Sequence, residues 1–343
     1  MRQPLIFESF TQAYYALVAD TYAGYEYETA PRGMKIRENL FTSFAITNPR
    51  DRLLYIPERK FSLQYVMAEI LWYLSGNNKT DWISNYSSFW SQISDDGVTA
   101  NSAYGARIFV PHRYHNNVML GNKFADGVPR SEVPPAGWSQ WQYIKDELTK
   151  DPDTRRAVIH IRQPQDSYLA QKDVPCTLNL QFFVRDKKLH MIVQMRSNDL
   201  ILGTALDVPA FTFMQELMAL ELGVDVGVYY HTSNSMHVYE RHYDMCEKIL
   251  NAETTLASTA MPSLKEKPPI DKLMDLERRA RQTTTSQELI VLGNEARFYS
   301  DVLWTDWAHI LLAHRAKKIN DVKLEQWFNE GLTLKCFKDL VEK

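Results

Sequence analysis

The chain has 343 residues, of which 45% are hydrophobic and 24% are charged, a composition typical of folded globular proteins and not of disordered or fibrous ones. Its 39 lysines and arginines against 42 aspartates and glutamates leave a formal net charge of −3. A general nucleic-acid binder would show a basic excess, so no nucleic-acid partner is expected. Any nucleotide ligand would then be a small molecule held in a pocket.

The sequence shows no signal peptide, no membrane helix and no cysteine pattern typical of disulfides or zinc. The N-terminal stretch MRQPLIFESF lacks the basic start and apolar run of a signal peptide, and no apolar run approaches the roughly 18 residues of a membrane helix. Cys176, Cys246 and Cys336 are far apart and odd in number, so neither a disulfide framework nor a CxxC zinc site is expected. We therefore expect a cytoplasmic protein without membrane attachment or a bound metal.

Up to residue 150 the pattern is mainly helical, because apolar residues recur at helical spacing. One of these helices carries Glu69 and is stopped by Gly76. A strand is expected at 40–47, and the stretch 121–138, with its glycines, prolines and charges, is expected to be an exposed loop or insertion. The predicted helices are 7–19, 61–74, 81–93 and 139–148.

Beyond residue 150 strands come first and helices follow. A turn at 185–187 joins two of the strands into a hairpin, and the polar, proline-containing stretch 253–285 is predicted to be a connector. The mixture predicts an α+β catalytic domain at 1–252 and a connector with a C-terminal helical extension at 253–343. The predicted strands are 157–161, 178–184, 189–194 and 227–231, and the predicted helices are 211–222, 243–250, 289–317 and 323–342.

A cysteine and several arginines give the strongest chemical signal. Cys176 begins one strand of the predicted hairpin and Arg196 ends the other, so antiparallel pairing brings them together. A nearby arginine lowers the pKa of a thiol and favours the nucleophilic thiolate. Arg155 and Arg156 suit bidentate contact with a phosphate. The spacing indicates a nucleophile beside an anion site, although a buried thiol among surface arginines gives the same spacing.

Motifs in matching order resemble the thymidylate synthase superfamily over roughly residues 7–250. The runs DVPCTLNLQFFV, QMRSNDLILGTALDVPAF and SMHVYERH contain a Pro-Cys nucleophile, an Arg-Ser-x-Asp segment, a glycine followed four residues later by an acid, and a His-x-Tyr pair. Upstream, AEILWYLSG, Phe89-Trp90, Tyr104-Gly105 and DTRR resemble the family's glutamate helix, tryptophan segment, Tyr-Gly pair and double arginine. The resemblance implies a large bent mixed sheet flanked by helices and a dimer formed through its sheet face.

The resemblance also implies how a nucleotide is held. Cys176 adds to C6 of a pyrimidine nucleotide, which makes C5 nucleophilic. Arg155 and Arg156 reach the phosphate from the second subunit of an obligate homodimer, while Arg32 and Arg37 both remain candidates for the N-terminal phosphate arginine. The implied nucleotide-binding residues are Arg32, Arg155, Arg156, Arg196, Ser197, Asp207, His237 and Tyr239.

The implied cofactor is 5,10-methylenetetrahydrofolate. Asp199 holds its pterin, Trp90 lies against the cofactor and the reacting base, and Glu69 and Tyr104 organise water and proton transfer. The residues implied to contact the cofactor are Glu69, Trp90, Asp199 and Gly203, and those implied to take part in catalysis are Glu69, Tyr104, Cys176 and Asp207.

One departure from the family pattern bears on the substrate. Thymidylate synthases have asparagine where this chain has Asp207. An amide donates to uracil O4 and accepts from N3–H, whereas cytosine presents an N4 amino donor and an N3 acceptor. A carboxyl group accepts from the amino group and can share a proton with N3, so Asp207 predicts a cytidylate. Ser197 resembles the residue of the family's deoxynucleotide-using members, which implies deoxyribose while ribose stays open. The alternative for Asp207 is a loop or helix-cap acid.

Further departures concern the product. Thr177 replaces the usual histidine after the nucleophile, Met195 replaces glutamine, and no counterpart of the family's short closing tail is evident before the helical extension. A site that admits water would hydrate the exocyclic methylene, so we expect a 5-hydroxymethylase of dCMP or CMP. The alternatives are a cytidylate C5-methyltransferase, a thymidylate synthase or dUMP hydroxymethylase, and a non-catalytic nucleotide- or RNA-binding relative.

Overall fold

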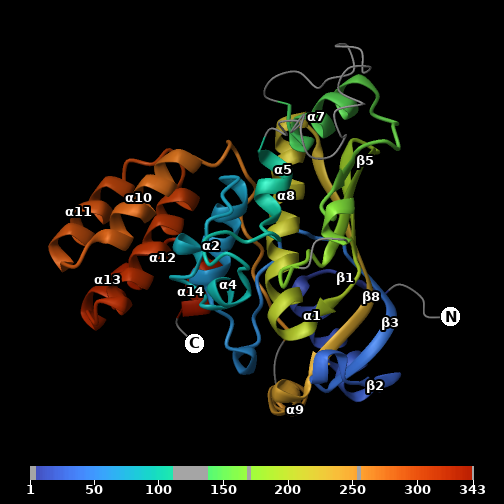
Figure 1. Ribbon diagram of the computed structural model, residues 1–343. Helices are drawn as coiled ribbons and strands as arrows, with labels where there is room; N and C mark the ends of the chain where they lie inside the picture. Colours follow the sequence, from blue (N-terminus) through green and yellow to red (C-terminus); the bar gives the residue numbers. More distant parts are fainter. Residues whose placement is uncertain (1–4, 111–137, 168–170, 253–255, 342–343) are drawn as a thin grey trace.

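The computed structural model describes residues 5–110, 138–167, 171–252 and 256–341. Within them a mixed eight-stranded sheet has the order β1-β3-β8-β6-β5-β4, with β2 paired to β3 and β7 paired to β8 (Figure 1). The long central strand β8 pairs antiparallel with β3 and parallel with β6. The strands are β1 (Leu5–Phe7), β2 (Tyr27–Thr29), β3 (Ile36–Ile46), β4 (Val158–His160), β5 (Thr177–Arg185), β6 (Lys188–Met195), β7 (Asn198–Asp199) and β8 (Asp225–Tyr239).

The predicted hairpin is present as β5 and β6. Thr177 pairs with Met195 in antiparallel register, and Asp186 and Lys187 make the turn with φ of 50° and 59°. Apolar side chains alternate along both strands and point into the core, as expected for a sheet with one covered face. The backbone N–H of Arg196 donates to the carbonyl of Cys176 at 2.9 Å, so the two strand ends lie together as expected.

Helices cover one face of this sheet, and the C-terminal helices form a further layer beyond α2 (Figure 1). A π-helical turn, Leu200–Thr204, leads into the buried helix α8. The helices are α1 (Phe10–Val18), α2 (Leu63–Leu74), α3 (Thr80–Ile83), α4 (Phe89–Ile93), α5 (Tyr104–Phe109), α7 (Gln140–Lys150), α8 (Ala205–Leu222), α9 (Tyr243–Asn251), α10 (Ile270–Gln282), α11 (Ser286–Ala296), α12 (Val302–Lys318), α13 (Val322–Glu330) and α14 (Lys335–Val341).

Several predicted elements need correction. The connector expected at 253–285 contains α10, whose Leu273, Leu276 and Ala280 form a buried stripe at helical spacing that the high charge of the segment concealed. The helix expected at 81–93 is divided into α3 and α4. Each of the two helices expected at 289–317 and 323–342 is divided into two. Asp301 caps α12 after α11 has ended, and Gly331 ends α13 before α14 begins. The loop expected at 121–138 lies outside the described residues except for its last position.

The C-terminal helices share one hydrophobic core with the first part of the chain. The indole N–H of Trp307 on α12 donates to the carbonyl of Met67 on α2 at 3.2 Å, and the same ring packs edge-on against Phe213 of α8. The hydroxyl of Tyr55 donates to the carbonyl of Cys336 at 2.7 Å. None of the helices described here is both long enough and apolar enough to cross a bilayer.

Candidate active site

Cys176 lies directly before β5, half-buried and unpaired with the other cysteines. The guanidinium of Arg196 donates to the carbonyl oxygens of Pro175 at 3.0 Å and Val174 at 2.9 Å, which fixes it beside the thiol. Burial nevertheless raises the pKa of Cys176, outweighing the lowering effect of Arg196 and Arg32. The net lowering expected from sequence is therefore wrong, because the arginine is present but the thiol is desolvated.

The two candidates for the N-terminal arginine have different surroundings. Arg32 is exposed in a tight turn, with φ of 53°, and its charge acts on the thiol of Cys176. The guanidinium of Arg37 donates to the carbonyl of Tyr22 at 2.9 Å and lies over three tyrosine rings at 4.5 to 4.6 Å. Arg37 is thus held by cation–π contacts within the protein, whereas the exposed Arg32 is near enough for its charge to act on Cys176.

Asp207 lies in the first turn of α8 and is 8% exposed. Burial raises the pKa of its carboxyl to about 7. Nδ2 of Asn198 donates to Oδ2 of Asp207 at 2.8 Å, and the hydroxyl of Thr204 donates to Oδ1 of Asn198 at 2.7 Å, which fixes the orientation of the amide. A Cβ at Gly203 would lie 2.8 Å from Nδ2 of Asn198, so only glycine lets the π-helical turn approach so closely.

Glu69 lies on α2, is 4% exposed, and ends a chain of hydrogen bonds. The indole N–H of Trp90 donates to the hydroxyl of Tyr65 at 2.9 Å, and this hydroxyl donates to Oε1 of Glu69 at 3.1 Å. Burial, with the nearby charge of Asp207, raises the pKa of Glu69 to about 8. Tyr65 was not predicted as a site residue, although it precedes Glu69 by one helical turn on the same face.

Tyr104 opens α5 and is buried between aromatic rings, with Tyr73 at 5.3 Å and Phe211 at 5.7 Å between ring centroids. Burial raises the pKa of its hydroxyl well above the ordinary value, and the charges of Asp207 and Cys176 act on it in the same direction. A Cβ on the next residue, Gly105, would lie 2.0 Å from the carbonyl oxygen of Tyr73. The Tyr-Gly pair therefore combines a buried hydroxyl, on which Asp207 and Cys176 act, with a close contact between α5 and α2.

Four further predicted site residues lie in or beside β7 and at the end of β8, namely Ser197, Asp199, His237 and Tyr239. Oγ of Ser197 is 3.5 Å from Nδ1 of His237, whose ring packs edge-on against Tyr239 at 5.1 Å. Burial lowers the pKa of His237, opposed by the charge of Asp199. One carboxylate oxygen of Asp199 accepts two backbone N–H groups of the following turn, at 2.8 and 3.1 Å.

Arg155 and Arg156 are exposed on the segment before β4. In the described residues their backbone carbonyls accept hydrogen bonds from Gln181 and Tyr143, while neither guanidinium forms an ion pair. Within a single chain they are therefore available to an external anion. The described residues also contain no cluster of three or more His, Cys, Asp or Glu side chains that could hold a metal ion.

A buried polar network that sequence reasoning missed supports the cysteine loop. Arg107 on α5 forms a bidentate pair with Asp166, at 2.6 and 2.8 Å. Asn101 donates to Asp166 and to the backbone carbonyl of Asp173, at 3.2 and 3.0 Å, and the Ser102 N–H donates to the Asp173 carboxylate at 2.8 Å. The network ties the loop that leads to Cys176 to the start of α5, where Tyr104 lies.

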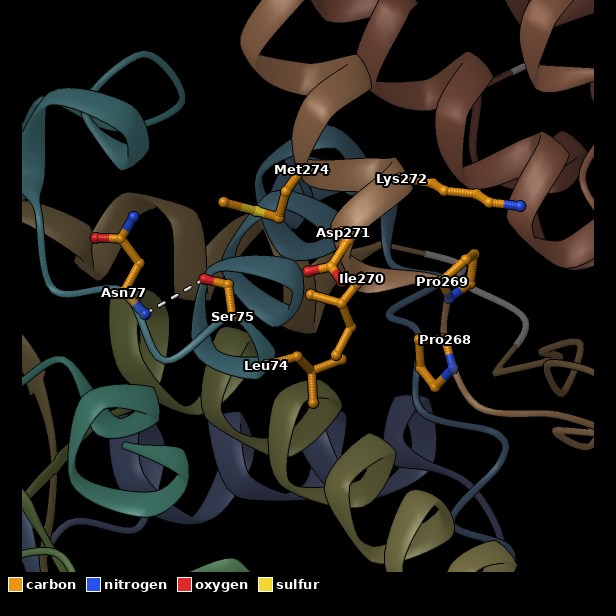
Figure 2. Close-up of a pocket in the computed structure, with 9 residues that line it drawn as sticks. All are labelled: Leu74, Ser75, Asn77, Pro268, Pro269, Ile270, Asp271, Lys272 and Met274. Atoms are coloured by element: carbon orange, nitrogen blue, oxygen red, sulfur yellow. Dashed lines mark hydrogen bonds between the residues drawn. The ribbon is translucent and has the colours of Figure 1, made fainter. Parts of the chain in front are cut away.

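A large cavity of about 710 Å³ lies elsewhere, between the end of α2 and the N-terminus of α10 (Figure 2). Its lining includes Ser75, Asn77, Asp271 and Lys272, with none of the predicted site residues. The N–H of Asn77 donates to Oγ of Ser75 at 3.3 Å, so part of its polar rim is already satisfied. Size alone does not make this cavity the candidate site.

Comparison with known proteins bears on this architecture. The chain superposes on the thermostable thymidylate synthase A from Bacillus subtilis with a TM-score of 0.55, at 20% identity, covering 72% of this chain and 86% of that one. The fold is therefore that of a thymidylate synthase. The family described as thymidylate synthase matches residues 12–282, and the chain belongs to this family.

Two similar curated proteins come from bacteriophages. A deoxyuridylate hydroxymethyltransferase of Bacillus phage SP01 is 34% identical over 217 residues, which are 62% of this chain and 53% of that protein. One of Delftia phage PhiW-14 is 32% identical over 225 residues, covering 62% of this chain and 56% of the relative. The chain thus spans about half the length of the curated relatives it matches.

Proposed function

We propose that this protein transfers a one-carbon unit to C5 of a pyrimidine nucleoside monophosphate, with dCMP (or CMP) as substrate and the 5-hydroxymethyl nucleotide as product. The observation that carries the proposal is Asp207, a buried carboxyl at the position that reads the base in the family. Its partner Asn198 donates to Oδ2, so Oδ2 acts as an acceptor and a proton on the carboxyl belongs on Oδ1. Such a carboxyl offers cytosine an acceptor for the N4 amino group and a donor for N3.

The protein's own groups fit the proposed chemistry around C6 and C5. Cys176 adds to C6 as the nucleophile, and Arg196 favours the thiolate against its desolvation. Glu69, with its pKa of about 8, can hold or release a proton near neutral pH. Tyr104 adds a buried hydroxyl on which the charges of Asp207 and Cys176 act. Water that reaches the exocyclic methylene at C5 would give the hydroxymethyl product, whereas hydride would give a methyl group.

The residues present fit a reduced folate. In the described part of the chain, Oδ2 of Asp199 has no hydrogen-bond partner, so it is available to the donor groups of a pterin. We propose that Asp199, Trp90, Gly203 and Glu69 would hold 5,10-methylenetetrahydrofolate. When bound, this cofactor supplies the one-carbon unit.

For the phosphate we propose Arg32, Arg196 and Ser197 from one subunit, with His237 and Tyr239 on the sugar. Arg37 is not proposed, because the tyrosine rings already hold it. Arg155 and Arg156 would come from the second subunit of a homodimer formed through the sheet face, which no described helix covers (Figure 1). All three cysteines are free thiols, which suits a cytoplasmic setting.

A second candidate is a deoxyuridylate hydroxymethylase, favoured by the names of the phage relatives. The neutral carboxyl of Asp207 could also donate to uracil O4 and accept from N3–H if its proton faced O4. The fixed amide of Asn198 therefore matters, because it decides which carboxyl oxygen can carry the proton.

The test is a competition among dCMP, CMP and dUMP with labelled methylenetetrahydrofolate, with the product identified by mass spectrometry. We expect 5-hydroxymethyl-dCMP and free tetrahydrofolate, and no product from Cys176→Ser. A methylated base with stoichiometric dihydrofolate would refute the hydroxymethylase, and turnover of dUMP alone would refute the cytidylate. Unchanged biological activity of Cys176→Ser would instead indicate a non-catalytic relative.

A further inference from the structure

The segment 80–93, which carries Trp90, rests on a buried carboxylate of the C-terminal helices. Glu277 of α10 is 1% exposed. It accepts hydrogen bonds from the indole N–H of Trp82 and from the hydroxyl of Tyr86, the latter at 3.3 Å. Arg281, one turn later on α10, lies 3.3 Å from the same carboxylate. A buried carboxylate is costly unless donors surround it, so Glu277 and this segment hold each other in place.

A second contact on α12 supports the same segment. Nε2 of His314 lies 3.0 Å from the carbonyl oxygen of Asn85, and its ring stacks on Tyr86 at 4.4 Å between centroids. The 80–93 segment is divided into two short helices, which have little stability of their own. Contacts with α10 and α12 therefore help to fix its position, together with the packing of Trp90 on Trp72 of α2 at 4.8 Å between ring centroids.

The segment is joined to the candidate site through Trp90, which packs on Trp72 and forms a hydrogen bond toward Glu69. The indole N–H of Trp90 is the donor to Tyr65, which in turn donates to Glu69. A shift of the segment would move both the indole ring and this donor. α12 lies after residue 282, where the family match ends, so part of this support comes from outside the matched region.

We propose that Glu277 and His314 are positioning residues that hold Trp90 where a reduced folate binds, so that the C-terminal helices set the affinity of the site for folate. This inference rests on the proposed function. Neither side chain contacts the nucleotide-binding residues described above. Disturbing them should therefore change folate binding and leave nucleotide binding unaltered.

Glu277→Leu replaces the carboxylate with an apolar side chain of similar size, so Trp82 and Tyr86 both lose their hydrogen-bond acceptor. Glu277→Gln can keep both contacts, because its amide oxygen accepts from Trp82 and its amide nitrogen donates to the hydroxyl of Tyr86. By calorimetry with tetrahydrofolate and with dCMP, we expect Glu277→Leu to weaken tetrahydrofolate binding about five- to tenfold, with dCMP binding unchanged. Glu277→Gln should behave like the wild type. Glu295→Gln, which breaks the exposed pair with Arg279, is the matched control and should change neither affinity.

Wild-type tetrahydrofolate affinity in Glu277→Leu, or an equal loss for both ligands, would overturn the inference. If Glu277→Leu does not fold, Trp82→Phe is used instead, because it removes only the indole donor to Glu277. It too should weaken tetrahydrofolate binding and leave dCMP binding unchanged. Binding is measured without turnover, so a wild-type protein that binds tetrahydrofolate but transfers no carbon would refute the proposed function alone. A wild-type protein that does not bind tetrahydrofolate would refute both.

Discussion

At the scale of single residues, the burial of Asp207 determines the protonation of the carboxyl that is proposed to recognise the base. Its pKa of about 7 lies well above the ordinary value for an aspartate, and burial is the main cause. Both ways of reading a pyrimidine through this carboxyl require one proton on it. The proton is present below the raised pKa and is lost as the pH rises through about 7.

We therefore predict that nucleotide binding weakens above pH 7. The measurement is the Kd of dCMP and dUMP in Cys176→Ser between about pH 6 and about pH 8, one unit on either side of the raised pKa. In this variant the thiol does not titrate. Asp207→Asn should remove the decrease in binding centred near pH 7, leaving only the titration of Glu69 near pH 8, and shift preference toward dUMP by about tenfold or more. Binding of dCMP that is independent of pH in Cys176→Ser would contradict this assignment.

The sequence predicted which residue types meet at the site but not their electrostatic state. Cys176 and Arg196 were placed together correctly, because strand pairing is a local property of a hairpin. The direction of the thiol pKa was predicted wrongly, because desolvation comes from side chains remote in sequence. Asn198 and Thr204 lay inside quoted motifs, yet their role depends on the π-helical turn that brings them against Asp207.

At the scale of elements, the loop that carries the nucleophile depends on α5. The Arg107–Asp166 pair is buried, with side chains 10% and 1% exposed. Removing one partner of such a pair leaves an uncompensated charge. The exposed Arg278–Asp275 pair on α10 is a matched control of the same chemistry, with side chains 52% and 49% exposed.

We predict that Arg107→Ala lowers the free energy of unfolding by about 3–5 kcal/mol, while Arg278→Ala changes it by about 1 kcal/mol or less. Urea denaturation followed by circular dichroism measures both. Asp166→Asn keeps the shape of the side chain but removes its charge. It should also slow turnover, because the loop that leads to Cys176 loses its ion pair with Arg107. Equal effects of Arg107→Ala and Arg278→Ala would show that the network does not support the loop.

Elements with strong periodicity were predictable, and those that depend on distant partners were not. α2 and the β5–β6 hairpin follow from apolar spacing. α10 was predicted as a connector because its buried stripe is narrow and its charge is high, and its helix is completed by packing against α12 and α2. The break between α3 and α4 likewise becomes clear only when their packing against α10 and α12 is seen.

At the scale of the whole molecule, Arg155 and Arg156 are exposed while the phosphate site is proposed to need them. If they act across a dimer interface, each active site combines residues of two chains. The Arg155→Ala/Arg156→Ala double variant and the Cys176→Ser variant should both be inactive alone.

Mixing these two variants in equal amounts and allowing subunits to exchange should restore about one quarter of wild-type activity, because random pairing gives one intact site in half of the dimers. Activity of the refolded mixture measures this, with each variant refolded alone as the control. A mixture that stays inactive although subunits exchange would place both arginines outside the site of the neighbouring chain.

The contact between Tyr55 and Cys336 joins residues 281 positions apart, and that between Trp307 and Met67 joins residues 240 apart. A ribosome makes the chain from its N-terminus, so α2 leaves the exit tunnel long before its outer partners exist. Until then the apolar surface beneath α12 is uncovered, and closing such long loops is slow. We therefore expect the nascent protein to acquire its working site only after translation has passed the last helices, with chaperones covering α2 in the interval.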